Sequence, residues 1–172
     1  MLQRFISIGL IRELGTTLFP SGNWHQSFSE RIFDPTTRDR DALLRVGDRI
    51  SARACTLLFN RIEGPVLAAA KQHCTLRAYG KPKAFLELLA SVQRSLADAG
   101  FSQIATGVTP HITLSYRATR TFDSVPLAPA ISWTIDTLCL VIGSGDPYRY
   151  EVIGRWPLLS ELDPPATQPS LF

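Results

Sequence analysis

The sequence is poor in the residues that mark several classes of protein. Its 172 residues include only three cysteines, Cys55, Cys74 and Cys139, too few and too widely spaced for a disulfide framework or a zinc-ligand pattern. Cys74 and Cys139 lie in apolar runs, so we expect buried, inert thiols. No apolar run approaches the roughly 20 residues that span a bilayer, and the first ten residues lack the cleavage site of a signal peptide. We therefore expect a reduced, cytoplasmic protein.

Charge is also scarce. Charged residues make up 19% of the chain and hydrophobic residues 45%, which excludes intrinsic disorder and a coiled coil. The net charge is only +3, and most of the basic residues are arginine. A nucleic-acid-binding surface normally carries much more positive charge, whereas a few arginines suit the recognition of phosphate oxygens. The charge therefore permits a phosphorylated ligand without demanding one.

Hydrophobic periodicity predicts both helices and strands. Apolar residues at three- and four-residue steps predict a helix over 82–99, ended by Gly100, and a second helix over 38–46. The same spacing favours an N-terminal helix that ends at Gly15, although alternation over 6–10 also fits a strand. Runs rich in β-branched and aromatic residues predict strands over 54–61, 73–79, 111–116, 131–143 and 148–155.

These elements predict an α+β fold, because strands outnumber helices and the two types are mixed in order. The last two strands are separated by a short polar stretch and should form a hairpin. We expect residues 1–159 to form a single domain. Residues 160–172 are rich in proline and polar residues, and we expect them to form a loosely attached or mobile tail.

Two of the three histidines share a local pattern. His25 and Ser27 lie in the sequence Asn-Trp-His-Gln-Ser-Phe, and His111 and Thr113 lie in Pro-His-Ile-Thr-Leu. Residues i and i+2 of an extended strand point to the same face, so each motif would present an imidazole beside a hydroxyl. The third histidine, His73, lacks this pattern, and we interpret it as structural.

Such a grouping suits the cleavage of a phosphodiester without a metal. An unperturbed histidine has a pKa near 6.5, so a neutral ring can accept a proton while a second, protonated ring donates one to the leaving oxygen. Serine and threonine hydroxyls can hydrogen-bond the phosphate oxygens. Either motif alone occurs often by chance, and it is their pairing that favours a function.

Three further residues are candidates for substrate binding. Arg117 alternates in phase with His111 and Thr113 and could reach a phosphate, while Tyr116 or Trp24 could stack on a base. The alternatives are an exposed arginine at the end of a strand and a tryptophan packed in the core.

The two motifs resemble the paired signature of the 2H phosphoesterase superfamily. Its LigT-like branch, which comprises 2′-5′ RNA ligases and RNA 2′,3′-cyclic phosphodiesterases, is the most similar. The stretch Asn23–His25 resembles the approach to the first motif of that branch, 109–114 resembles its second motif, and Tyr150–Leu158 resembles its closing strand. The resemblance covers about residues 15–158.

The resemblance implies a bilobal α+β fold in which two antiparallel sheets face a central cleft, with helices on the outside. It implies that His25 protonates the leaving ribose oxygen, that His111 activates water, and that Ser27 and Thr113 hold the phosphate. The implied substrate is an RNA with a 2′,3′-cyclic phosphate or a 2′-5′ linkage, or a small cyclic nucleotide. No metal or other cofactor is implied, and we expect a monomer that does not associate with membranes.

The first motif departs from the family pattern. Ser27 replaces the commoner threonine and Gln26 replaces an apolar residue. Little sequence precedes His25, and we expect the opening strand of the family to be missing or replaced. These departures keep two alternatives open. The protein could bind RNA or a nucleotide without turnover, or it could be an α+β domain whose histidines are structural.

Overall fold

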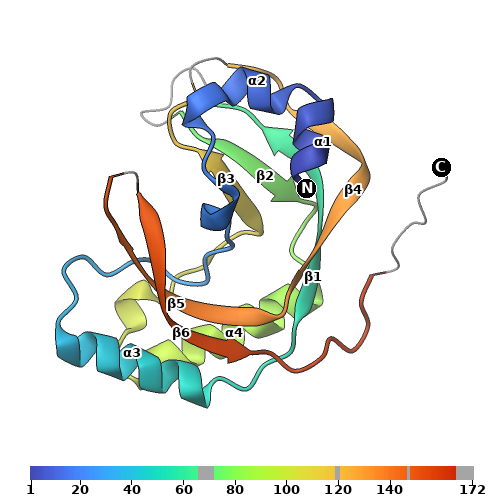
Figure 1. Cartoon of the computed structure of the whole chain (residues 1–172). Coiled ribbons are helices and arrows are strands. Elements are labelled where there is room, and N and C mark those ends of the chain that lie inside the picture. The colour runs from blue at the N-terminus through green and yellow to red at the C-terminus, as the bar shows by residue number, and fades with distance from the viewer. Residues whose placement is uncertain (66–71, 119–120, 147, 166–172) are drawn as a thin grey trace.

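The computed structural model in Figure 1 describes residues 1–65, 72–118, 121–146 and 148–165. The chain has the predicted α+β architecture with two antiparallel sheets. The helices are α1 (Leu2–Ser7), α2 (Leu10–Leu14), α3 (Thr37–Arg49) and α4 (Lys83–Asp98), with 3₁₀ turns η1 (Gly15–Thr17), η2 (Ser21–Asn23) and η3 (Ser102–Ile104). The strands are β1 (Cys55–Glu63), β2 (Cys74–Ala78), β3 (His111–Ser115), β4 (Val125–Ile135), β5 (Thr137–Ser144) and β6 (Arg149–Pro157).

The two sheets differ in size. The larger sheet has the order β3-β2-β1-β4, so β3 lies at an edge, and the smaller sheet is the predicted hairpin of β5 and β6. In Figure 1, α1 and α2 lie at the end of the molecule occupied by the larger sheet, and α3 and α4 lie at the opposite end, where the hairpin of β5 and β6 is. Helix α3 packs against β5, β6 and α4, and α4 also contacts β1.

The longest helix follows its apolar pattern. Its predicted core positions are all buried, and they are Phe85, Leu88, Leu89, Val92 and Leu96. Gly100, just after the helix, has a φ of 86°, a left-handed conformation that costs glycine no steric strain. Helix α3 begins with a capping box between Thr36 and Asp39, in which each side chain accepts from the backbone N–H of the other residue.

Two predicted elements are divided in the structure. The apolar run over 131–143, predicted as one strand, is two strands in different sheets, separated at Asp136. The run crosses this boundary because β4 buries apolar residues on one face and β5 partly buries them, so composition does not mark where the chain changes sheet. The predicted N-terminal helix is interrupted at Gly9, whose φ of 75° separates α1 from α2.

The cysteines divide between the core and the surface. Cys55 and Cys74 are fully buried in the larger sheet, and burial raises the pKa of each thiol to about 12. The expectation of a buried thiol is wrong for Cys139, which is exposed. Cys139 lies on β5, in a sheet of only two strands, where part of the surface of the apolar run stays open to solvent.

The beginning of the predicted tail is attached to the larger sheet. The carboxylate of Glu161 accepts hydrogen bonds from the backbone N–H of Thr56 at 2.9 Å and from its hydroxyl at 2.6 Å. The rest of the predicted tail, 166–172, lies outside the described residues. Within the part of the chain that the structure describes, no helix is both long and apolar enough to cross a membrane.

Candidate active site

The second histidine motif lies on a strand, as predicted. His111 and Thr113 belong to β3, and they pair with Arg77 and Thr75 of the antiparallel strand β2. Because side chains alternate along a strand, His111 and Thr113 share one face of the larger sheet. His111 is partly buried, whereas Thr109 before it and Tyr116 after it in the sequence are exposed to solvent.

The first motif reaches the same place by a different route. Residues 24–27 do not belong to a strand, contrary to the strand geometry from which the sequence argument started. The chain instead follows the free edge of β3: the N–H of Phe19 donates to the carbonyl of Leu114 at 2.8 Å. Further along, the side chain of Gln26 accepts the N–H of His111 at 2.7 Å. Covering this edge satisfies backbone groups that an edge strand leaves unpaired.

Both imidazoles are held in the same way. Nδ1 of His25 contacts the carbonyl oxygen of Asn23 at 2.7 Å, and Nδ1 of His111 contacts the carbonyl oxygen of Thr109 at 2.9 Å. A carbonyl oxygen can only accept, so Nδ1 of each ring carries a proton and donates it. Nε2 has no hydrogen-bond partner in either ring among the described residues. Each ring therefore keeps Nε2 available, as a base when neutral and as an acid when protonated.

The electrostatic surroundings of His111 favour the neutral ring. Burial lowers the pKa of His111, and the positive charges of Arg77 and His25 lower it further. The hydrogen bond to Thr109 and the negative charge of Glu63 act in the opposite direction. The net effect is a pKa below the ordinary value of 6.5, so His111 is mainly neutral at pH 7. Gln26, the residue after His25, bonds the backbone of both Thr109 and His111, which places the first motif beside the second.

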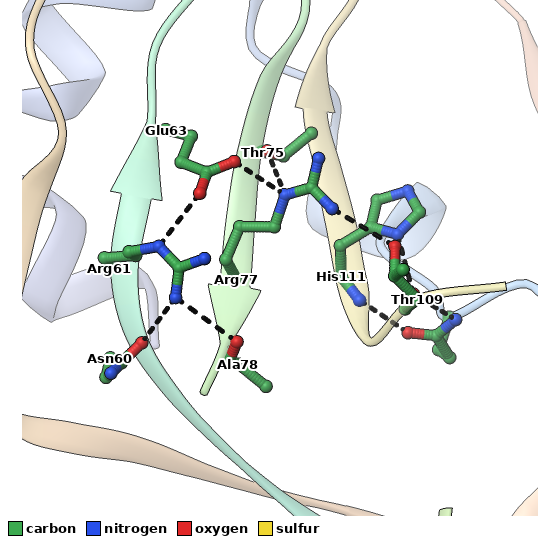
Figure 2. Close-up of polar contacts among 9 residues, drawn as sticks. Asn60, Arg61, Glu63, Thr75, Arg77, Ala78, Thr109 and His111 are labelled. Atoms are coloured by element: carbon green, nitrogen blue, oxygen red, sulfur yellow. Dashed lines mark hydrogen bonds and ion pairs between the residues drawn. The ribbon is translucent and has the colours of Figure 1, made fainter. Parts of the chain in front are cut away.

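A row of alternating charges crosses the sheet to His111. Figure 2 shows Arg61 and Arg77 on either side of Glu63, each with its Nε 2.9 Å from a carboxylate oxygen. Arg77 also donates to the hydroxyl of Thr109 at 3.2 Å. Thr109 is the residue whose carbonyl holds the ring of His111. The two arginines exceed the one glutamate in charge, so the row places net positive charge beside the site.

Aromatic rings lie next to His25 on the other side. The ring of Tyr150 meets the His25 ring edge to face, with 4.9 Å between centroids, and Tyr148 meets Tyr150 in the same manner at 5.4 Å. Asn23 ties this hairpin to the first motif by donating its amide to the carbonyl of Tyr148 at 2.9 Å. Burial raises the pKa of Tyr150, with smaller contributions from Tyr148 and Tyr116.

The predicted substrate-binding residues have different surroundings. Tyr116 is 49% exposed, and its ring contacts those of Phe19 and His73. Trp24 is partly buried: its ring packs on Phe5 of the core, and its N–H donates to the carbonyl of Phe19 at 2.9 Å. These contacts correspond to the core alternative for Trp24, and we leave it out of the proposed site.

The alternation argument for Arg117 does not hold along the whole of β3. Thr113 pairs with Thr75 whereas Ser115 pairs with Cys74, so the register shifts between them. Ser115 is consequently fully buried although it has the same parity as Thr113. Arg117 lies beyond this irregularity and is exposed. Ser27 is exposed as well, and its hydroxyl has no hydrogen-bond partner within the described ranges.

Sequence reasoning missed the residues that surround the two histidines. Arg77 carried a usable signal, because Thr75 and Arg77 alternate in the predicted strand over 73–79. Glu63 and Tyr150 carried none, since their positions depend on which strands become neighbours. Gln26 was noted only as a departure from a family pattern. No group of three or more histidine, cysteine, aspartate or glutamate side chains in the described residues could hold a metal ion.

Comparison with known proteins shows which fold this is. No family model matches the sequence, and no curated protein is significantly similar to it. Among solved structures, E. coli LigT in its apo form superposes with a TM-score of 0.72 at 19% identity, covering 91% of this chain and 90% of LigT. The protein TT0787 of Thermus thermophilus gives 0.69 at 15%, covering 94% of each chain, and a structure described as a phosphoesterase gives 0.64 at 21%, covering 91% and 92%. The chain has the LigT fold, and the predicted resemblance is confirmed at that level.

Proposed function

We propose that this protein is a metal-independent phosphodiesterase that opens 2′,3′-cyclic phosphates at RNA ends or in nucleotides, leaving a 2′-phosphate. The observation that carries the proposal is the matched pair of imidazoles, each anchored through Nδ1 to the carbonyl two residues earlier and each with Nε2 available. The two motifs lie side by side, because Gln26 bonds the backbone of Thr109 and His111. A titratable group with a shifted pKa in such a cluster is typical of a functional site.

The different surroundings of the rings support different roles. His111, with its lowered pKa, is the base: its Nε2 takes a proton from a water molecule as the water oxygen attacks phosphorus. The bond between phosphorus and the ribose O3′ breaks, and protonated His25 donates its Nε2 proton to that oxygen. The product is a 2′-phosphate with a free 3′-hydroxyl. Transfer of a proton from His111 to His25 through solvent restores the starting state.

The phosphate needs donors for its non-bridging oxygens during this step. We assign that role to Thr113, on the same strand face as His111, and to Ser27, two residues after His25. Both hydroxyls can donate without first breaking a hydrogen bond within the described chain. The excess positive charge of the Arg61–Glu63–Arg77 row favours an anionic substrate. Arg117 remains a candidate for a more distant phosphate.

Tyr148 and Tyr150 support a nucleotide rather than a simple phosphodiester as substrate. Aromatic rings bind bases by stacking. Tyr150 contacts the ring of His25, where the leaving ribose oxygen would be protonated, and Tyr148 contacts Tyr150. Tyr116 is exposed and is available for a second base. The solved complexes of LigT with 3′-AMP and with phosphate are consistent with a nucleotide at this site.

The test is turnover of a 2′,3′-cyclic nucleotide by the purified protein in the presence of a chelator. We expect release of the 2′-monophosphate, and a loss of about 10²–10⁴-fold in kcat for His25→Ala and for His111→Ala. His73→Ala, which removes the histidine outside the motifs, should retain most of the activity. Turnover that both motif variants preserve would overturn the proposed mechanism.

The same experiment addresses two alternatives. Saturable nucleotide binding without any product would indicate a binding module instead of an enzyme. If an RNA 5′-hydroxyl replaces water as the nucleophile, the same bond to O3′ breaks and a 2′-5′ linkage forms. Adding an RNA with a free 5′-hydroxyl would reveal that ligase reaction as a joined product.

A further inference from the structure

Gln26 connects the two histidine motifs directly. Its Oε1 accepts the backbone N–H of His111 at 2.7 Å, and its Nε2 donates to the carbonyl of Thr109 at 3.3 Å. The same Nε2 also donates to the carbonyl of Ser27, within its own motif, at 2.7 Å. One side chain from the first motif therefore bonds to the backbone on both sides of Pro110.

The groups that Gln26 holds are those that orient the base. The carbonyl of Thr109 accepts Nδ1–H of His111, which fixes both the tautomer and the direction of the ring. Rotating the 109–111 backbone would move this carbonyl and turn Nε2 of His111 away from its target. Because β3 is an edge strand, no neighbouring strand holds the outward N–H of His111, and Gln26 does so instead.

The corresponding residue of the second motif behaves differently. Ile112, which follows His111 as Gln26 follows His25, is fully buried in the core. The first motif cannot be anchored in that way, because residues 24–27 do not form a strand of either sheet. At the equivalent position of the two motifs, Gln26 is thus polar and bonds the second motif, whereas Ile112 is apolar and packs in the core.

We propose that Gln26 is a positioning residue that fixes His111 relative to His25 by linking the two motifs. This inference rests on the proposed two-histidine reaction. Positioning matters because a displacement of about 1 Å in a reacting group can cost about 10²-fold in rate. Gln26 acts through the Thr109 carbonyl and the His111 backbone, and it takes no part in proton transfer itself.

The decisive variant is Gln26→Leu, which keeps the size of the side chain and removes all three hydrogen bonds. We expect kcat for a 2′,3′-cyclic nucleotide to fall by about 10–100-fold while KM changes little. Hydrogen exchange at the His111 amide should become faster, because that N–H loses its acceptor. In ¹⁵N spectra, the His111 ring should change from a single Nδ1–H tautomer to a mixture.

Gln26→Glu tests the link in a second way. The carboxylate still accepts from the N–H of His111 but can no longer donate to the carbonyls of Thr109 and Ser27. Its negative charge beside His111 should raise the pKa of that ring, so the acidic limb of the kcat/KM profile should move to higher pH. This shift reports that residue 26 lies beside the His111 ring, whereas the fall in kcat of Gln26→Leu tests the positioning role.

Gln93→Leu is the matched control. Gln93 also donates its amide to two backbone carbonyls, those of Ala105 and Thr106, but it touches neither motif. Its variant should lose stability with kcat unchanged. If the wild type is active and Gln26→Leu keeps its kcat, or keeps the His111 amide protected, the positioning role is wrong while the proposed function stands. If the wild type has no activity, both are overturned.

Discussion

Arg77 lies directly opposite His111 on the neighbouring antiparallel strand, and its guanidinium hydrogen-bonds the hydroxyl of Thr109, whose carbonyl anchors the His111 ring. Glu63 bonds the same guanidinium from the next strand. A base with a lowered pKa on β3 therefore lies beside a positive charge on β2, which is itself paired with a negative charge on β1. In the row shown in Figure 2, Glu63 partly neutralises the charges of Arg61 and Arg77. Arg77 and Glu63 also shift the pKa of His111, in opposite directions.

Glu63→Gln and Arg77→Met should shift the pH dependence of activity in opposite directions. Neutral His111 is the active form of the base, so the acidic limb of kcat/KM rises with pH through its pKa, and a basic limb falls where the general acid loses its proton. Glu63 raises the pKa of His111, so removing its charge should move the acidic limb of the kcat/KM profile to lower pH. Arg77 lowers the pKa of His111, so removing its charge should move the acidic limb to higher pH. The measurement is kcat/KM between about pH 4 and pH 9.

Lys83→Met serves as the control for these profiles. Lys83 is exposed on α4, where it pairs with Glu87, and its removal changes the net charge as Arg77→Met does. The acidic limb of the kcat/KM profile of Lys83→Met should coincide with that of the wild type. Shifts of Glu63→Gln and Arg77→Met in the same direction would contradict the role assigned to the row.

The sequence is informative where a function or a fold is local. The helix over 82–99 and the strand of His111 and Thr113 follow from periodicity, because their buried faces are determined by nearby residues. The break at Asp136 and the approach of the first motif to the edge of β3 depend on long-range pairing, which no local pattern records. Arg77 could have been found by alternation; Glu63 could not, because its contact requires knowing that β1 and β2 are neighbours.

Tyr148→Ala should weaken the binding of nucleotides selectively. Stacking on an aromatic ring contributes about 1–3 kcal/mol per base, so we expect KM for a 2′,3′-cyclic nucleotide to rise about tenfold. Tyr148→Phe keeps the ring and should behave as the wild type. The baseless substrate glycerol 1,2-cyclic phosphate provides the contrast: its kcat/KM should not change in either variant. An equal loss for both substrates would show that Tyr148 supports the site without contacting a base.

Gly47→Ala should destabilise the fold, although alanine is the better helix former. In a helix interior, alanine is favoured over glycine by about 1 kcal/mol. At Gly47 of α3, however, a Cβ would overlap the indole of Trp156, which is fixed by a 2.7 Å hydrogen bond from its N–H to Asp48. We expect overpacking to prevail and the free energy of unfolding to fall by about 1–3 kcal/mol in urea titrations.

Gly107→Ala is the control for this substitution. A Cβ at Gly107 meets open space, and its φ lies outside the left-handed region, so its free energy of unfolding should change by no more than about 0.5 kcal/mol. A Gly47→Ala variant as stable as the wild type would mean that α3 and β6 can separate without cost.

Glu161→Ala should destabilise the larger sheet from outside it. Thr56 is 7% exposed, and its N–H donates to Glu161 at 2.9 Å. Its hydroxyl can turn to Thr134, 2.9 Å away, but the backbone N–H would be left without an acceptor. An unsatisfied buried donor costs about 1–3 kcal/mol, which a fall in the urea midpoint at constant m-value would report.

Two variants are the controls for Glu161→Ala. Glu161→Gln keeps an acceptor for the Thr56 N–H and should lose less stability. Glu87→Ala removes an equally charged but exposed partner of Lys83 and should change stability by less than about 0.5 kcal/mol. If Glu161→Ala were as mild as Glu87→Ala, solvent would be replacing the carboxylate as the acceptor of the Thr56 N–H.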